Sequence, residues 1–192
     1  MMHAYAITDP KYYGTQPDTL KERVGELLAS CDVGLITLRD KKSADYRELA
    51  AAFMSLKPLF PETLFFLHGD IESAFELGAD GVHLPSDISG RVAEAAERGL
   101  KVIVSTHSYE EIRDCERAGA FGVTYGPVFE TPGKGAPKGL EKLKEITGKI
   151  SIKLFALGGI VTDEHIRAVE SAGADGFASI RYFAEKIHNQ GK

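Results

Sequence analysis

Cysteine is scarce in this chain of 192 residues, and so is any excess of positive charge. The two cysteines, Cys31 and Cys115, fall in or beside expected helices, which argues against a disulfide framework and a cysteine metal site. The net charge of -5 and the lack of a basic cluster argue against a nucleic-acid partner. No apolar run approaches the roughly 20 residues that span a bilayer, and no signal-peptide pattern is seen, so we expect a cytoplasmic soluble protein without a membrane partner.

Two further absences limit the chemistry. The nucleophile-elbow pattern Gly-x-Ser-x-Gly does not occur, and no histidines and carboxylates have a recognised metal-ligand spacing. Hydrophobic residues make up 43% and charged residues 27% of the chain, a balance that predicts one globular domain over residues 1–192.

A short glycine motif is repeated three times, at residues 78–82 (GADGV), 119–123 (GAFGV) and 173–177 (GADGF). Each copy follows an amphipathic helical stretch and leads into an apolar run. A glycine that ends a helix in a left-handed turn just before a buried strand is typical of the junctions in a parallel α/β fold. The repeat therefore predicts alternating helices and parallel strands.

Eight short apolar runs are strand candidates, with helical patterns between them. Starts of helices are indicated at Ser43, Ser108 and Thr162. This arrangement predicts a single compact (β/α)8 barrel, for which a doubly wound open sheet is the competing fold; the position of the last strand near the end of the chain favours closure. The expected strands are residues 4–8, 33–39, 64–68, 81–84, 102–107, 122–128, 153–157 and 176–182.

The carboxyl ends of barrel strands are where a site is expected. Gly158 and Gly159 leave the seventh strand, where backbone amides can approach a phosphate closely; the alternative is a tight turn without a ligand. The Gly- and Pro-rich stretch 129–139 predicts a long loop in which Lys134 either folds over a ligand or remains a solvated charge.

Two cations and one histidine complete the candidates from the residues alone. Arg39 and Lys41 alternate along the expected second strand and would converge on an anion, unless Asp40 only pairs with a neighbour in a solvated turn. His107 is the candidate acid/base, with Ser105 and Ser108 as groups that orient it. His68 and His83 are weaker candidates, and His83 is equally well explained as a hydrogen-bonded residue of the barrel wall.

These motifs, in this order, resemble the thiamine phosphate synthase and TenI superfamily of (β/α)8 barrels, and the likeness covers nearly the whole chain. The superfamily contains a synthase, which joins a hydroxymethylpyrimidine diphosphate to a thiazole phosphate with magnesium, and a metal-free tautomerase, which moves protons on a thiazole phosphate carboxylate. The motifs are residues 5–9 (YAITD), 38–41 (LRDK), 78–84 (GADGVHL), 105–108 (STHS), 126–131 (GPVFET), 158–160 (GGI) and 173–176 (GADG).

Departures from the synthase pattern lie at its magnesium and diphosphate site. The resemblance implies that a synthase would have Gln where this chain has Thr37 and an Asn-Asp pair where it has residues 68–69 (HG). A synthase would also have Gly-Gln followed by two acids where this chain has residues 85–88 (PSDI). A divergent synthase would therefore rebuild its magnesium site from Asp70 and Asp87.

The thiazole phosphate half of the pattern is better kept. The resemblance implies a phosphate cradle of Gly158, Gly159, Ser179 and Ile180, with Lys134 closing over it. It also implies substrate contacts by Arg39, Lys41, Ser105 and Thr131, and His107 as the acid/base. Arg181 replaces a small residue, and either strengthens phosphate binding or points outward as part of the scaffold.

The leading hypothesis is accordingly a TenI-type thiazole tautomerase, an isomerase that needs no cofactor and takes a small-molecule thiazole phosphate. The alternatives are the divergent magnesium-dependent synthase and a non-catalytic protein that binds thiamine intermediates. An unrelated phosphate-binding barrel of indole, histidine or isoprenoid metabolism would share the Gly-Gly pair and the repeat but not the other motifs. Barrels with exposed helices commonly form homodimers, which is our expectation here.

Overall fold

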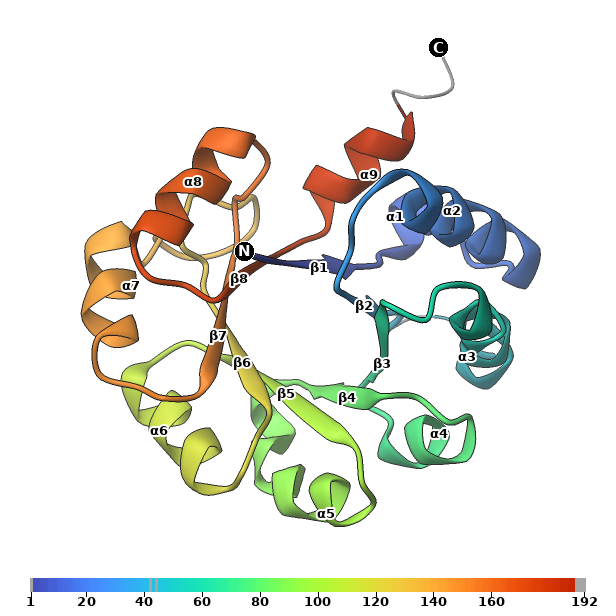
Figure 1. Cartoon of the computed structure of the whole chain (residues 1–192), viewed down its shortest axis with the longest axis horizontal. Helices are drawn as coiled ribbons and strands as arrows, with labels where there is room; N and C mark the ends of the chain where they lie inside the picture. Colours follow the sequence, from blue (N-terminus) through green and yellow to red (C-terminus); the bar gives the residue numbers. More distant parts are fainter. Residues whose placement is uncertain (1, 42, 44, 189–192) are drawn as a thin grey trace.

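Eight parallel strands close into a barrel in which each strand pairs with its neighbours in chain order and β8 pairs back with β1 (Figure 1). The computed structural model describes residues 2–41, 43 and 45–188. Closure confirms the predicted (β/α)8 barrel and rules out the doubly wound sheet. The strands are β1 (His3–Ile7), β2 (Leu35–Leu38), β3 (Leu64–His68), β4 (Gly81–Leu84), β5 (Lys101–Thr106), β6 (Gly122–Tyr125), β7 (Lys153–Leu157) and β8 (Gly176–Ser179).

The helices form a ring around the barrel, in which the last helix, α9, lies against α2 (Figure 1). In the described part of the chain, no helix combines the length and the apolar character needed to cross a membrane. The helices are α1 (Pro10–Tyr13), α2 (Pro17–Ser30), α3 (Tyr46–Met54), α4 (Ile71–Glu76), α5 (Val92–Glu97), α6 (Tyr109–Arg117), α7 (Leu140–Thr147), α8 (Asp163–Ser171) and α9 (Arg181–His188), with 3-10 turns η1 (Lys57–Leu59) and η2 (Ser86–Arg91).

The two glycines of the repeated motif have different structural roles. Its first glycine (residues 78, 119 and 173) has φ of 70°, 81° and 87°, the left-handed conformation predicted after each helix. Its second glycine starts β4, β6 or β8 beside an aromatic ring of the barrel interior. A Cβ on Gly176 would lie 2.6 Å from Cδ1 of Phe155, and one on Gly122 would lie 3.1 Å from Cε2 of the same ring. The second glycine is therefore required for packing.

Four large side chains from alternate strands form a layer in the barrel interior. Tyr5, Phe66, Ile103 and Phe155 come from β1, β3, β5 and β7, and all are at most 1% exposed. The Tyr5 ring lies 5.5 Å from that of Phe155 and 6.3 Å from that of Phe66. Because side chains alternate along a strand, the positions two and four residues further on face the carboxyl end of the barrel.

Two strand pairs are joined at their amino ends by the aspartates of the repeat. Asp80 accepts a hydrogen bond from the backbone N–H of Phe65 at 2.8 Å, and Asp175 accepts one from Leu154, also at 2.8 Å. Asp80 is in addition paired with Lys57 at 2.8 Å. Each carboxylate thus ties the start of one strand to the turn before the next.

Two of the three predicted helix starts are confirmed. Ser108 and Thr162 cap α6 and α8 as predicted, by accepting from the N–H groups of Glu111 and His165. The predicted start at Ser43 is wrong: α3 begins at Tyr46, and Ser43 instead bonds to Asp40, because its hydroxyl donates to that carboxylate at 2.6 Å.

The last strand is also shorter than the predicted range 176–182. β8 ends at Ser179, whose side chain accepts from the N–H of Tyr182 at 3.2 Å and so starts α9. Arg181 is consequently the first residue of a helix and does not lie on a strand. The serine cap ends the strand because a hydroxyl that satisfies a helix N–H favours the helical turn.

Candidate functional site

The turn after β7 is shaped by Gly158 and Gly159, with φ of 99° and 69°. Neither position has room for a side chain: a Cβ on Gly158 would lie 2.5 Å from Cα of Pro127, and one on Gly159 would lie 2.6 Å from the carbonyl oxygen of Glu130. The two glycines pack directly against the segment after β6, which begins with the cis Gly126–Pro127 peptide. Only backbone is available to a ligand here, as a phosphate cradle of amides requires.

The same turn is fixed to the start of α9. The hydroxyl of Ser179 donates to the carbonyl of Ile160 at 2.8 Å and accepts from the N–H of Tyr182. Ser179 is 5% exposed, and its side chain is used for these two bonds to the backbone. An anion at this turn would therefore meet the backbone around Ile180 and not the serine side chain. The first N–H groups of a helix lack intrahelical partners, which gives this end of α9 a partial positive charge. The Gly158–Gly159 turn and the start of α9 therefore lie together, and they are called the phosphate cradle below after their predicted role.

The long loop after β6 contacts the cradle through Thr131. Its hydroxyl donates to the carbonyl of Phe129 at 3.0 Å and lies 3.2 Å from where a Gly158 Cβ would be. Residues 132–138 are exposed, Lys134 among them. Thr131 is thus at the cradle, whereas the Lys134 side chain extends into solvent and its closing over a ligand stays a prediction.

His107 follows β5 and is exposed at the barrel mouth. Its Nδ1 donates to the carbonyl oxygen of Gly126 at 3.0 Å, so in the neutral ring Nε2 has no proton and can accept one. The prediction that Ser105 and Ser108 orient this ring is wrong. Ser105 bonds to His83, because its side chain points into the barrel, and Ser108 is used to cap α6.

The predicted cation pair does not lie on a strand. β2 ends at Leu38, because the N–H of Arg39 bonds to the hydroxyl of Thr8 at 2.9 Å instead of continuing the sheet. Arg39 pairs with Asp9 at 3.4 Å and is half-buried, while Lys41 is exposed.

Both cations nevertheless lower the pKa of the same residue, His68. The pKa of His68 is lowered to about 4, chiefly by burial, then by Arg39 and Lys41, and against the opposing effect of Asp87. His68 is therefore neutral at pH 7, and two positive charges face it at the barrel mouth. Since Arg39 is already paired with Asp9, the contact of Arg39 and Lys41 with an anionic substrate group stays a prediction.

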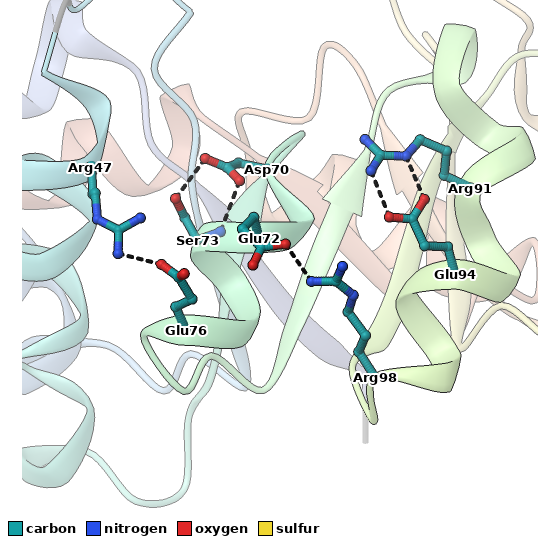
Figure 2. A network of polar contacts seen from close by, with 8 residues as sticks. All are labelled: Arg47, Asp70, Glu72, Ser73, Glu76, Arg91, Glu94 and Arg98. Atoms are coloured by element: carbon teal, nitrogen blue, oxygen red, sulfur yellow. Dashed lines mark hydrogen bonds and ion pairs between the residues drawn. The ribbon is translucent and has the colours of Figure 1, made fainter.

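The residues present do not fit a magnesium–diphosphate site of the synthase kind. Both oxygens of Asp70 accept hydrogen bonds from Ser73, from its N–H at 2.9 Å and from its hydroxyl at 2.6 Å, so this carboxylate caps α4 (Figure 2). Asp87 is exposed on η2. Within residues 2–41, 43 and 45–188, no three His, Cys, Asp or Glu side chains gather as a metal site.

Charges around α4 are paired with one another. Glu76 pairs with Arg47 on α3, and Glu72 pairs with Arg98 at the end of α5 at 2.5 Å (Figure 2). Arg91 and Glu94 form a two-pronged pair, with both nitrogen–oxygen distances at 2.7 Å. This side of the barrel therefore has a surface of mutual ion pairs around the Asp70 cap.

Two interactions near the site escaped the sequence analysis. One is a hydrogen-bonded chain from Tyr5 through His83 to Ser105. The other is the stacking of His165 on Phe129, with ring centroids 4.3 Å apart, beside the phosphate cradle. The only sequence signal for the first was a histidine at a position of β4 that alternation turns inward. His83 is hydrogen-bonded in the barrel wall, which confirms the structural alternative given for it in the sequence analysis.

Comparison with known proteins identifies the family of this barrel. A family model described as thiamine monophosphate synthase matches residues 4–183. The chain belongs to this family. A "putative thiamine-phosphate synthase 2" of Aquifex aeolicus (strain VF5) is 34% identical over 186 residues, which cover 94% of this chain and 97% of the relative. The thiamine-phosphate synthase of Pyrococcus furiosus is 32% identical over 182 residues, 92% of this chain and 84% of that protein.

Among solved structures, the thiamine phosphate pyrophosphorylase of Pyrococcus furiosus superimposes with a TM-score of 0.79 and 26% identity, covering 98% of this chain and 96% of that one. A 3-hexulose-6-phosphate synthase superimposes with a TM-score of 0.69 at 20% identity, which shows the fold alone. Family membership places the protein in thiamine biosynthesis, as the resemblance implied.

Proposed function

We propose that this protein binds a thiazole phosphate at the carboxyl end of its barrel and isomerises it, as the superfamily's tautomerase does. The observation that carries the proposal is the division between two halves of the mouth. The Gly158–Gly159 turn and the start of α9 offer backbone amides, and His107 offers a ring nitrogen that can accept a proton, which supports binding and proton transfer on this side. On the opposite side, Asp70 is used to cap a helix. The cofactor prediction, which is that none is needed, belongs to this proposal.

In the proposed reaction, the substrate phosphate lies on the backbone of Gly158, Gly159 and Ile180. Arg39 or Lys41 holds the substrate carboxylate by charge. Nε2 of His107 removes a proton from a ring carbon, the C–H electron pair moves into the ring, and the same proton or another is returned at a second atom. The product is the aromatic isomer, so atoms and electrons balance without an added reagent. Proton transfer by a placed histidine contributes about 10²–10⁴ in rate.

The test is hydrogen exchange on the thiazole phosphate carboxylate tautomer in deuterium oxide, followed by NMR. We expect His107→Gln to reduce the rate at least a hundredfold while phosphate binding remains. His3→Gln is the matched control, because His3 is exposed at the opposite, amino end of the barrel. Binding without turnover, unchanged by His107→Gln, would instead identify a non-catalytic binding protein.

The second candidate is a thiamine phosphate synthase, which the names of the relatives favour. Under this reading Asp70 would leave Ser73 and join Asp87 in rebuilding a metal site. The assay supplies hydroxymethylpyrimidine diphosphate and thiazole phosphate with and without magnesium, and follows thiamine phosphate and pyrophosphate. Magnesium-dependent product at a useful rate, abolished in Asp70→Asn, would overturn the tautomerase proposal.

A further inference from the structure

His107, the candidate acid/base, is held at two points by residues of different elements. Its ring Nδ1 donates to the carbonyl oxygen of Gly126 at 3.0 Å, and its backbone N–H donates to Oε2 of Glu111 at 2.6 Å. Gly126 follows β6, whereas Glu111 lies in the first turn of α6. The first contact orients the ring, and the second holds the backbone to which the ring is attached.

The contact with Glu111 differs from the usual start of a helix. In a capping box, the acid at the third helical position accepts from the N–H of the cap residue itself. The cap of α6 is Ser108, whose hydroxyl accepts from the N–H of Glu111 at 3.2 Å. The Glu111 carboxylate, however, reaches one residue further back and accepts from His107. The acid is therefore used for the residue that is the candidate acid/base.

Both partners of His107 belong to well-packed parts of the barrel. The helix that carries Glu111 is anchored by Ile112 and Cys115, which are 0% and 3% exposed. The backbone of Gly126 lies so close to β7 that a Cβ there would collide with the carbonyl of Leu157. His107 is itself exposed at the barrel mouth, so these two contacts are what fix its ring relative to the barrel.

A hydrogen bond from an N–H to a carboxylate is charge-assisted and roughly twice as strong as a neutral one. Proton transfer needs such restraint, because a misplacement of about 1 Å can cost about a hundredfold in rate. We propose that Glu111 is a positioning residue, which directs Nε2 of His107 at the substrate through its hydrogen bond with the His107 backbone. Glu111 acts through His107 and does not contact the substrate. The inference deepens the proposed function and rests on it.

The positioning can be tested without substrate, by nitrogen NMR at pH 8 of protein labelled with ¹⁵N-histidine. The neutral ring of His107, assigned by its loss in His107→Gln, should be protonated on Nδ1, because the Gly126 carbonyl can only accept. We expect Glu111→Ala to weaken this preference and Glu111→Gln, which keeps an acceptor oxygen, to retain it. An unchanged Nδ1 preference in Glu111→Ala would overturn the inference, because the ring would then be oriented without Glu111.

The role in catalysis is tested by steady-state kinetics and calorimetry with the thiazole phosphate carboxylate tautomer. We expect Glu111→Ala to lower kcat about ten- to a hundredfold, with KM and Kd within about threefold, because the phosphate cradle does not include Glu111. Glu111→Gln should restore most of kcat, since its amide oxygen can accept the same hydrogen bond. Glu110→Ala is the matched control. Glu110 is exposed in the same turn of α6, so this variant removes the same charge and should keep the wild-type kcat.

These arms separate the inference from the proposed function. Glu111→Gln as slow as Glu111→Ala would refute positioning by a hydrogen bond, because the acceptor oxygen is kept and only the charge is lost. Equal kcat in Glu111→Ala and Glu110→Ala would refute any role of the contact in the reaction. Failure of the wild-type protein to turn over the thiazole would refute the proposed function. In that case an Nδ1 preference that is lost in Glu111→Ala would still support the positioning of His107.

Discussion

Replacing Gly176 by alanine should destabilise the barrel far more than the same change at Gly122, although both glycines face one phenylalanine ring. The new methyl group at residue 176 would lie 2.6 Å from the carbonyl oxygen of His3 and 2.6 Å from Cδ1 of Phe155. Ordinary contacts are about 3.5–4 Å, so these atoms must separate by about 1 Å. Because one of them is backbone in the β1–β8 pairing, we expect a loss of about 3 kcal/mol, the upper end for overpacking.

At Gly122 the nearest atoms are 3.1 Å away on Phe155 and 3.2 Å away on the Lys153 carbonyl. The neighbours need to give by only a few tenths of an ångström, which predicts a loss of about 1 kcal/mol. Gly25, inside α2, has nothing within 4 Å of its Cβ position. Alanine there should stabilise the protein by about 0.5–1 kcal/mol through helix propensity.

The assay is urea unfolding followed by circular dichroism, with the free energy compared at a shared slope. The predicted order of stability is Gly25→Ala, wild type, Gly122→Ala and Gly176→Ala. Equal losses at residues 122 and 176 would refute the reasoning, because the difference between them comes from the distances to the Phe155 ring and to the neighbouring backbone carbonyls.

Three further results are expected. Gly159→Ala should weaken thiazole phosphate binding more than tenfold in calorimetry, because the methyl would lie 2.6 Å from the Glu130 carbonyl, while Gly135→Ala in the open loop should not. Asp70→Ala should cost about 1 kcal/mol in urea unfolding through the lost α4 cap, yet leave tautomerase turnover within twofold. His68 has a pKa of about 4 when folded and 6.5 as its ordinary value, so the unfolded chain binds more protons between these values and stability rises with pH across that window. His68→Gln should flatten this rise by roughly 1–3 kcal/mol, as measured by unfolding at pH 4.5 and 7; an unchanged slope would contradict the burial of a neutral imidazole.

The arrangement of strands could be predicted because its signals are local. The first glycine of each repeat marks a left-handed helix end, and the apolar runs at 64–68, 81–84 and 153–157 match β3, β4 and β7 to the residue. Closure into a barrel followed from the number of such units. The end of β8 could not be predicted, because Ser179 reads equally as a strand residue and as a helix cap until its partner at Tyr182 is known.

The site was harder to predict because it depends on which side chain meets which. Ser105 and His107 are neighbours in sequence, but one bonds to His83 inside the barrel and the other to the carbonyl of Gly126. Asp70 was proposed as a substitute metal ligand from its position alone, and only the contacts of Ser73 reveal its use as a cap. The pairings of Ser105 with His83 and of His107 with Gly126 join different strands of the barrel, and residue types do not encode them.

The aspartates at 80 and 175 have a consequence for how the ring is completed. Each aspartate lies just before one strand and accepts a hydrogen bond from the preceding strand: Asp80 links β3 to β4, and Asp175 links β7 to β8. Both bonds are 2.8 Å long, and the two strand pairs lie four strands apart. The β1–β8 pairing, in contrast, joins opposite ends of the chain. Loop-closure entropy makes the β1–β8 pairing the costliest strand contact to form. Neither Asp80 nor Asp175 supports this pairing with a side-chain hydrogen bond of the same kind. We therefore expect the β1–β8 pairing to open first under mechanical or chemical stress.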